Sequence, residues 1–242
     1  MPGRTFRYLA GSAVAAALLT AAPAVAQSFD SATAADDWAL YARLGVGWAS
    51  PNRLDQDLAF DPRTASFFTP PNRRVIDLED AASPTFAIGV AYPAGTRTEL
   101  EYRFLQPSFD EVTLFGGFGP GVTSPFPVTP SDEFTAHFLM SNAYFEVVRF
   151  GPVGAFVGAG VGGGFFADGL GQRDAAFAYQ GRTGVTVDLS RRATLQIEYV
   201  YLRTRDIVFG PDRLGRGALG GFQALGEPFV MSAADASIQF RF

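Results

Sequence analysis

The alternation at the C-terminal end of the chain, VMSAADASIQFRF, constrains the fold more than any other feature. In steps of two from Val230 to Phe242 one set of side chains is apolar or small, and the set between them includes Asp235 and Arg241. A period of two is that of a β-strand with one apolar and one polar face. The chain is therefore expected to build a sheet in which each strand turns one apolar face away from water.

The same period recurs along the chain and predicts eight strands. The first, WALYARLGVGW, has a Trp at each end of its apolar face, and its length suits a strand that crosses a bilayer. The predicted strands are Trp38–Trp48, Ser83–Tyr92, Arg97–Phe104, Glu133–Val148, Val153–Phe166, Ala175–Val187, Thr194–Leu202 and Val230–Phe242. Residues 49–82, 105–131 and 203–229 are predicted to be long loops, and these alternate with shorter connections, as in membrane barrels.

A soluble lipocalin-like barrel would alternate in the same way, with its apolar face inward. Two features favour the membrane instead. Small residues, above all the glycine row from Gly154 to Gly164, crowd the non-apolar face, where they would make room for long side chains in a narrow barrel. Aromatic residues begin and end the apolar faces, as interfacial belts require. The predicted fold is all-β, an eight-stranded antiparallel up-and-down transmembrane β-barrel.

The N-terminal stretch predicts export. Arg4 and Arg7 precede an apolar segment, and Ala24-Val25-Ala26 offers a small-residue cleavage site. Residues 1–26 are therefore predicted to be a signal peptide, residues 27–37 a short periplasmic lead and residues 38–242 the barrel. The chain has no Cys and carries 19 basic against 24 acidic residues, which excludes disulfides, thiolate metal sites and a basic nucleic-acid-binding surface. No cofactor or metal is expected.

Several stretches carry a resemblance to a known family. FAYQGRTGVTVDLS (Phe177–Ser190), TLQIEYVYL (Thr194–Leu202), the glycine-rich Gly151–Gly164 and the final SIQFRF are similar to the eight-stranded outer-membrane barrels of the opacity-protein and OmpA/OmpX type. The resemblance implies a porin-like barrel in the outer membrane of a Gram-negative bacterium, surrounded by lipid and lipopolysaccharide. It also implies that Phe240 and the terminal Phe242 form the signal for the barrel assembly machinery, and that the protein is a monomer.

The polar faces of the predicted strands supply charges of both signs, which inside a narrow barrel must pair or meet water. They predict a lumen charge network of Arg43, Arg97, Glu99, Glu101, Arg103, Glu146, Arg182, Asp188, Glu198, Asp235 and Arg241. The apolar faces predict interface aromatics at Trp38, Trp48, Tyr92, Tyr102, Tyr199 and Tyr201. The network is interpreted as a structural plug, with a polar pathway as the alternative.

His137, Ser141 and Asn142 are the one hint of catalysis. Lipid A deacylases of similar size use a His and a Ser two residues apart, whereas here the spacing is four. At about 3.3 Å per residue the pair would lie roughly 13 Å apart, far beyond the reach of a nucleophile and its base. No catalytic residue is therefore assigned. Arginines in the predicted outer loops, among them Arg73, Arg74, Arg203 and Arg205, could contact lipopolysaccharide phosphates.

Two classes of function follow from this interpretation. The first is a non-catalytic barrel that displays long extracellular loops for envelope structure, adhesion or contact with an unidentified host or surface ligand. The second is a narrow porin for small solutes, and a lipid A-modifying enzyme is a remote third. The packing of the lumen distinguishes the first two, because a filled interior excludes a continuous water path.

Overall fold

The computed structural model describes residues 38–60, 71–92, 95–116, 124–128, 134–167, 173–209 and 222–242. The predicted signal peptide and periplasmic lead lie outside these residues. Among the described residues, no helix is long and apolar enough to cross a membrane.

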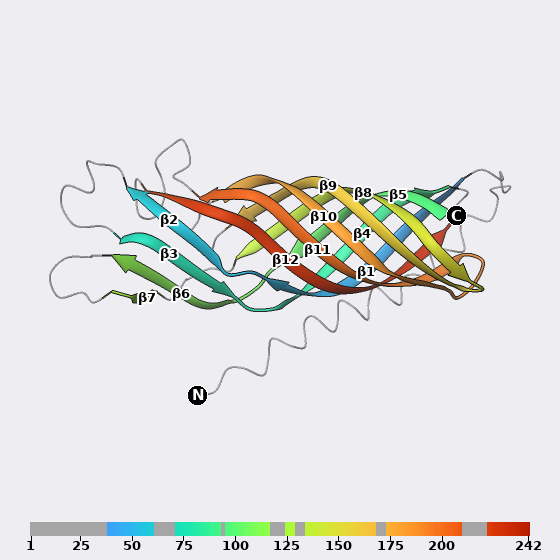
Figure 1. The fold of residues 1–242 in the computed structure, drawn as a ribbon, viewed down its shortest axis with the longest axis horizontal. Helices are drawn as coiled ribbons and strands as arrows, with labels where there is room; N and C mark the ends of the chain where they lie inside the picture. Colours follow the sequence, from blue (N-terminus) through green and yellow to red (C-terminus); the bar gives the residue numbers. More distant parts are fainter. Residues whose placement is uncertain are drawn as a thin grey trace, which may run out of the picture.

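Eight of the strands close into an antiparallel barrel, which confirms the predicted fold (Figure 1). Each barrel strand pairs with the next in chain order, and the last pairs with the first through a register that joins Tyr41 to Arg241. The barrel strands are β1 (Ala39–Pro51), β4 (Ala81–Ala91), β5 (Thr96–Leu105), β8 (Thr135–Phe150), β9 (Val153–Ala167), β10 (Arg173–Asp188), β11 (Ala193–Phe209) and β12 (Phe222–Arg241).

The prediction of three long loops is wrong in part, because these segments contain further strands. They are β2 (Leu54–Phe60), β3 (Pro71–Leu78), β6 (Phe109–Gly116) and β7 (Phe126–Val128), and β11 and β12 also run beyond their predicted ends. The four added strands continue the sheet from β12 in the order β2, β3, β6, β7. They extend beyond the end of the barrel opposite the C-terminus (Figure 1). We call this part the extension.

The extension is joined to the barrel wall by breaks of two or three residues. At the break between β1 and β2, the Asn52 backbone N–H donates to the carbonyl of Val230 at 2.8 Å, and its side-chain oxygen accepts from the Val230 N–H at 2.8 Å. Between β3 and β4, the Glu79 N–H donates to the carbonyl of Ser108 at 2.9 Å. These bonds satisfy backbone groups that a loop would leave to water, so the extension is a continuation of the sheet.

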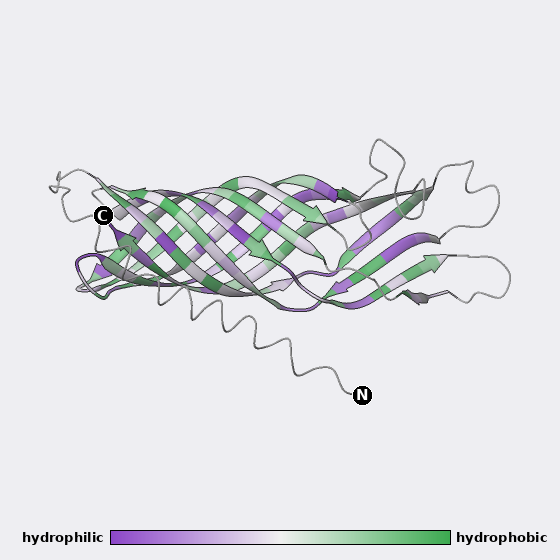
Figure 2. Cartoon of the chain, turned by 180° about the vertical axis from the view of Figure 1, so that it is seen from behind, coloured by the Kyte–Doolittle hydropathy of each residue, from purple (hydrophilic) through white to green (hydrophobic). Residues whose placement is uncertain are grey.

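The outer face of the barrel is apolar along its length. Leu40, Ile88, Leu100, Val157 and Ile197 are each about half exposed in the isolated protein, and hydrophobic and hydrophilic residues alternate along the barrel strands (Figure 2). A broad apolar surface on a monomer needs a non-aqueous partner. The belt therefore fits the hydrocarbon core of a bilayer.

The register of β8 is seen from which of its side chains are buried. Leu139, Phe145 and Val147 point outward, and Asn142 and Tyr144 point inward. A register shift between Glu146 and Val148 places both Val147 and Val148 on the outer face. Phe138 and Met140 are buried in the interior, so the alternation is not broken there. It is hidden because both faces are apolar at this height.

The glycine row on β9 makes room for the long inward side chains of β8. Gly158, Gly160 and Gly162 pair with Tyr144, Asn142 and Met140. A Cβ at Gly160 would lie 1.9 Å from the Asn142 side-chain oxygen, and one at Gly158 would lie 2.5 Å from the Tyr144 ring. Neither distance is sterically allowed, so these positions require glycine while their partners keep their side chains.

Candidate functional site

The interior of the barrel has two layers of side chains. The lower layer, nearer the end with the C-terminus, is ionic, and the upper layer lies nearer the extension. Seven side chains of the predicted network form it: Arg43, Glu99, Glu101, Arg103, Arg182, Glu198 and Asp235. They come from strands on all sides of the barrel, and each is at most 4% exposed. The layer therefore spans the lumen and packs it with charged groups that partner one another.

Arg43 and Arg182 bridge the carboxylates of this layer. The Arg43 guanidinium contacts Glu101 at 2.5 Å and Glu198 at 3.2 Å, and it also binds Glu99. The Arg182 guanidinium donates to Glu101 at 2.5 Å and to the Tyr144 hydroxyl at 2.6 Å.

Arg103 completes the layer by pairing with Asp235 and contacting Glu101 at 3.5 Å. Three guanidinium groups thus face four carboxylates across the lumen. Such a network is stabilising only while its members stay together, because each charge is removed from water.

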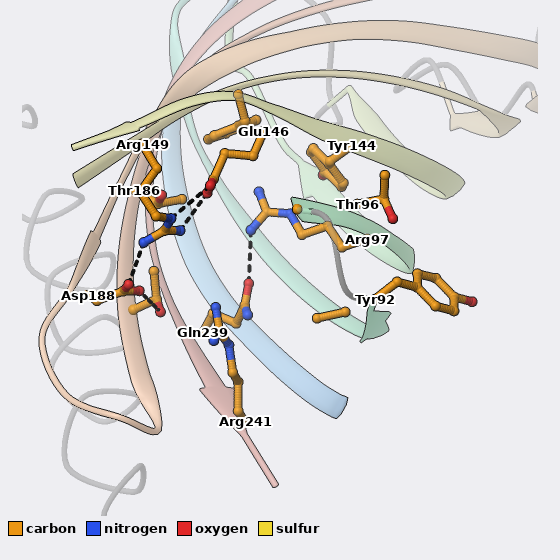
Figure 3. Close-up of a pocket in the computed structure, with 14 residues that line it drawn as sticks. Tyr92, Thr96, Arg97, Tyr144, Glu146, Arg149, Thr186, Asp188, Gln239 and Arg241 are labelled. Carbon is orange, nitrogen blue, oxygen red and sulfur yellow. Dashed lines mark hydrogen bonds and ion pairs between the residues drawn. The ribbon is translucent and has the colours of Figure 1, made fainter. Parts of the chain in front are cut away.

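Four residues of the predicted network lie outside this layer. Arg97, Glu146, Asp188 and Arg241 line a separate cavity at the mouth of the barrel beside the C-terminus (Figure 3). Glu146 and Asp188 both pair with Arg149, at 2.5 Å each, although the sequence placed Arg149 in a turn. The charges therefore form two groups and not one continuous network.

The upper layer of the interior is apolar, and the sequence analysis missed it. Phe134 stacks on Phe229 with ring centroids 6.0 Å apart and an angle of 14° between their planes. Phe138 and Phe166 meet edge to face at 5.6 Å, and both contact Phe229. All four side chains are buried, together with Met140, Leu202 and Met231 of the same cluster. The sequence signal for this layer is the apolar run at 138–140, where both faces of the strand are apolar.

The predicted interface aromatics all lie on the outer face. Trp38 is 56% exposed and Trp48 is 55% exposed, and Tyr92, Tyr102, Tyr199 and Tyr201 are also exposed. The Trp48 indole N–H donates to Asp80 at 3.2 Å, which joins an apolar ring to a polar partner at the base of the extension. Phe240 and Phe242 also face outward, and the Phe242 backbone N–H donates to the carbonyl of Leu40 at 3.0 Å.

His137 lies on the outer face of β8. Its Nδ1 lies 2.7 Å from the Tyr102 hydroxyl, and its ring packs 5.0 Å from the ring of Phe104. Ser141 is exposed on the same outer face, whereas Asn142 points inward and donates to Glu99 at 3.2 Å. The structure therefore does not bring these residues together as a catalytic group. Among the described residues, no cluster of His, Asp and Glu could hold a metal ion.

The loop arginines differ in their surroundings. Arg73 is exposed on β3 and donates to Asp55 of β2, with Nε 2.6 Å from the carboxylate. The hydrogen bonds from Arg73 lower the pKa of the Asp55 carboxyl. Arg74 is instead buried and donates to the Gln56 side-chain oxygen at 2.6 Å, so it is not available to lipopolysaccharide. Arg203 and Arg205 are exposed on β11.

No protein-family model and no curated protein matches the chain. Several solved structures do match it in fold. Neisserial surface protein A is 12% identical with a TM-score of 0.51, and the match covers 84% of this chain and 97% of that one. The outer membrane protein OprG from Pseudomonas aeruginosa is 16% identical with a TM-score of 0.49, covering 84% and 95%. The outer membrane protease OmpT from Escherichia coli is 8% identical with a TM-score of 0.40, covering 89% and 100%.

Similarity at this level of identity shows the fold alone. It agrees with the closed antiparallel barrel described above. The chain therefore has the fold of an integral outer-membrane β-barrel of eight strands.

Proposed function

We propose that this protein is a non-catalytic outer-membrane barrel that presents a sheet-like extracellular extension for envelope structure or surface interaction. The observation that carries the proposal is the filled interior. The ionic layer and the apolar layer lie one above the other, and the side chains of both are almost fully removed from solvent. A lumen packed in this way serves as a rigid support and leaves little room for solutes.

The extension supports a role in contact at the cell surface. Its strands β2, β3 and β6 are paired along most of their length and are joined to barrel strands by short breaks. A paired sheet holds its exposed side chains, including Arg73 and Asp55, in fixed positions. A fixed surface loses less conformational entropy on binding than a flexible loop does.

Conductance in planar lipid bilayers tests the proposal. The purified protein is expected to give no steady current above the bare-membrane level, because ions would have to cross both packed layers. A control is the same protein with Phe134, Phe138 and Phe229 replaced by alanine, which opens only the upper layer and should still not conduct. A steady open channel in the wild-type protein would favour the narrow porin instead.

Assembly in the outer membrane rests on the C-terminal strand. We propose that Phe242 and Phe240 are read by the barrel assembly machinery, since both face outward at the end of β12. Phe242→Ser should lower the amount of heat-modifiable barrel in the outer membrane, whereas Phe150→Ser, at another exposed aromatic of the same end, should not. Equal amounts of barrel in all three proteins would contradict this role. Lipid and lipopolysaccharide are the proposed surroundings of the assembled monomer.

A further inference from the structure

The cavity at the barrel mouth beside the C-terminus has a volume of about 340 Å³, which is within the range of small-ligand sites. It is lined by inward-facing residues of several barrel strands (Figure 3). The short turns and the C-terminus are at this end of the barrel, which is the periplasmic end in membrane barrels of this layout. The cavity therefore opens toward periplasmic solutes.

On one side of the cavity the charges are already paired. Arg149 donates to Glu146 at 2.7 Å and to Asp188 at 2.5 Å. Asp188 also accepts a hydrogen bond from the Thr194 hydroxyl at 2.8 Å. Both carboxylates of the cavity wall are therefore occupied by Arg149 and its neighbours.

On the other side, two guanidinium groups lack a carboxylate. Arg97 lies over the rings of Tyr144 and Phe156, 4.4 Å and 4.8 Å from their centroids, and donates only to the side-chain oxygens of Gln239 and Gln196. The aromatic contacts hold its guanidinium in one plane. The position of its guanidinium is therefore fixed, but within the described chain its hydrogen-bond acceptors are neutral amide oxygens.

Arg241 is the second of these groups. Its side chain points into the cavity (Figure 3), and its Nε atom is buried with no hydrogen-bond partner. In the described part of the chain, neither Arg97 nor Arg241 forms an ion pair with a carboxylate. A guanidinium group that faces a cavity without a carboxylate beside it is stabilised by an anion bound there.

We infer that this mouth cavity is a binding site for a phosphate group, held by Arg97 and Arg241. Guanidinium groups bind phosphate oxygens through paired N–H donors. Three arginines against two carboxylates give the cavity wall a net positive charge, which favours an anion such as inorganic phosphate or a phosphate monoester. The same chemistry could come from the headgroup of a phospholipid in the adjacent leaflet, although the lining residues face the lumen and so favour a soluble ligand.

The test uses the full mature chain refolded in octyl glucoside micelles, which contain no phosphate. Inorganic phosphate is titrated at pH 8 by calorimetry, with the arginine Nε–H signals followed by NMR and with sodium chloride at matched ionic strength as the blank. A short-chain phosphatidylglycerol is titrated in a second arm. Saturable binding in either arm, with shifted Arg97 and Arg241 signals, is the expected result, and the arm that binds identifies the source.

Variants distinguish binding at this cavity from non-specific attraction of phosphate to the positive charge of the protein. Arg241→Gln should weaken binding about ten-fold or more, and Arg241→Lys should restore part of it. Arg203→Gln removes the same charge from the exposed outer face and should bind as the wild type does. Heat-modifiable migration checks that each variant is folded. If neither phosphate source binds saturably, or if Arg241→Gln and Arg203→Gln weaken binding equally, the site does not exist.

Discussion

Replacing Arg182 by methionine should destabilise the barrel more than replacing Glu101 by glutamine. Both side chains are fully buried in the ionic layer and contact each other at 2.5 Å. In the wild type, three guanidinium groups face four carboxylates. Removing Arg182 leaves two against four, whereas removing the charge of Glu101 leaves three against three. The two changes break the same ion pair but alter the charge balance in opposite directions.

The expected magnitudes follow from the partners that are lost. Arg182 also contacts Glu198 at 3.2 Å and Asp235 at 3.4 Å. Its removal therefore leaves both carboxylates buried without this partner. Breaking a buried pair by removing one partner costs about 3–5 kcal/mol, and we expect Arg182→Met to lower the free energy of unfolding by that amount. Glu101→Gln keeps the shape and the balance, so about 1–3 kcal/mol is expected.

Urea unfolding in phosphatidylcholine vesicles, followed by the fluorescence of Trp38 and Trp48, measures both changes. At pH 8 the methionine variant should unfold at a lower urea concentration than the glutamine variant, and both should unfold below the wild type. The reasoning would be refuted if the glutamine variant were the less stable of the two.

Three further outcomes test other parts of the structure. Gly160→Ala should destabilise the barrel by about 1–3 kcal/mol through overpacking, and Gly181→Ala, where a Cβ meets nothing within 4 Å, should be nearly neutral in the same unfolding assay. Val157→Arg should cost about 2–4 kcal/mol if that side chain lies near the bilayer midplane, and an unchanged stability would contradict its outward register. The hydrogen bonds from Arg73 lower the pKa of the Asp55 carboxyl, so its contribution to stability should be present above the ordinary aspartate pKa of 3.8 and lost as the pH falls through the lower folded value. Hydrogen exchange of the β2 and β3 amides should show this loss only under acidic conditions.

The eight barrel strands were predictable because lipid-facing and lumen-facing residues alternate along every strand of a membrane barrel. Lipid on one side and a narrow lumen on the other require opposite side chains at neighbouring positions, as at Leu100 and Glu101. The glycine row was informative for the same reason, since a Cβ at Gly158 or Gly160 would collide with the side chain of Tyr144 or Asn142 as they are placed. The outward position of Val157 and the inward position of Arg182 follow from this local pattern alone.

The extension was not predictable in this way. Strands β2, β3 and β6 lie beyond the bilayer, where neither face has to be uniformly apolar, and prolines and charges made the segments resemble loops. Arg74 and Val75 are adjacent on β3 and both are buried, so no alternation marks the strand. The pairing of these strands depends on backbone partners that are distant in sequence, such as Leu225 of β12 and Asp57 of β2.

The sequence by itself determined which residues face lipid and which face the lumen, because that choice depends only on the alternation along each strand. The tertiary structure alone decided how the lumen residues are grouped, because the height of each residue in the barrel depends on the register between strands. That register places Glu101 beside Arg43 and Arg182, yet it leaves Arg97 and Arg241 at the mouth without a carboxylate partner among the residues that the structure describes. It also stacks Phe134 on Phe229 across 95 positions of sequence. No local pattern contains these pairings, since they arise only when the last strand closes on the first.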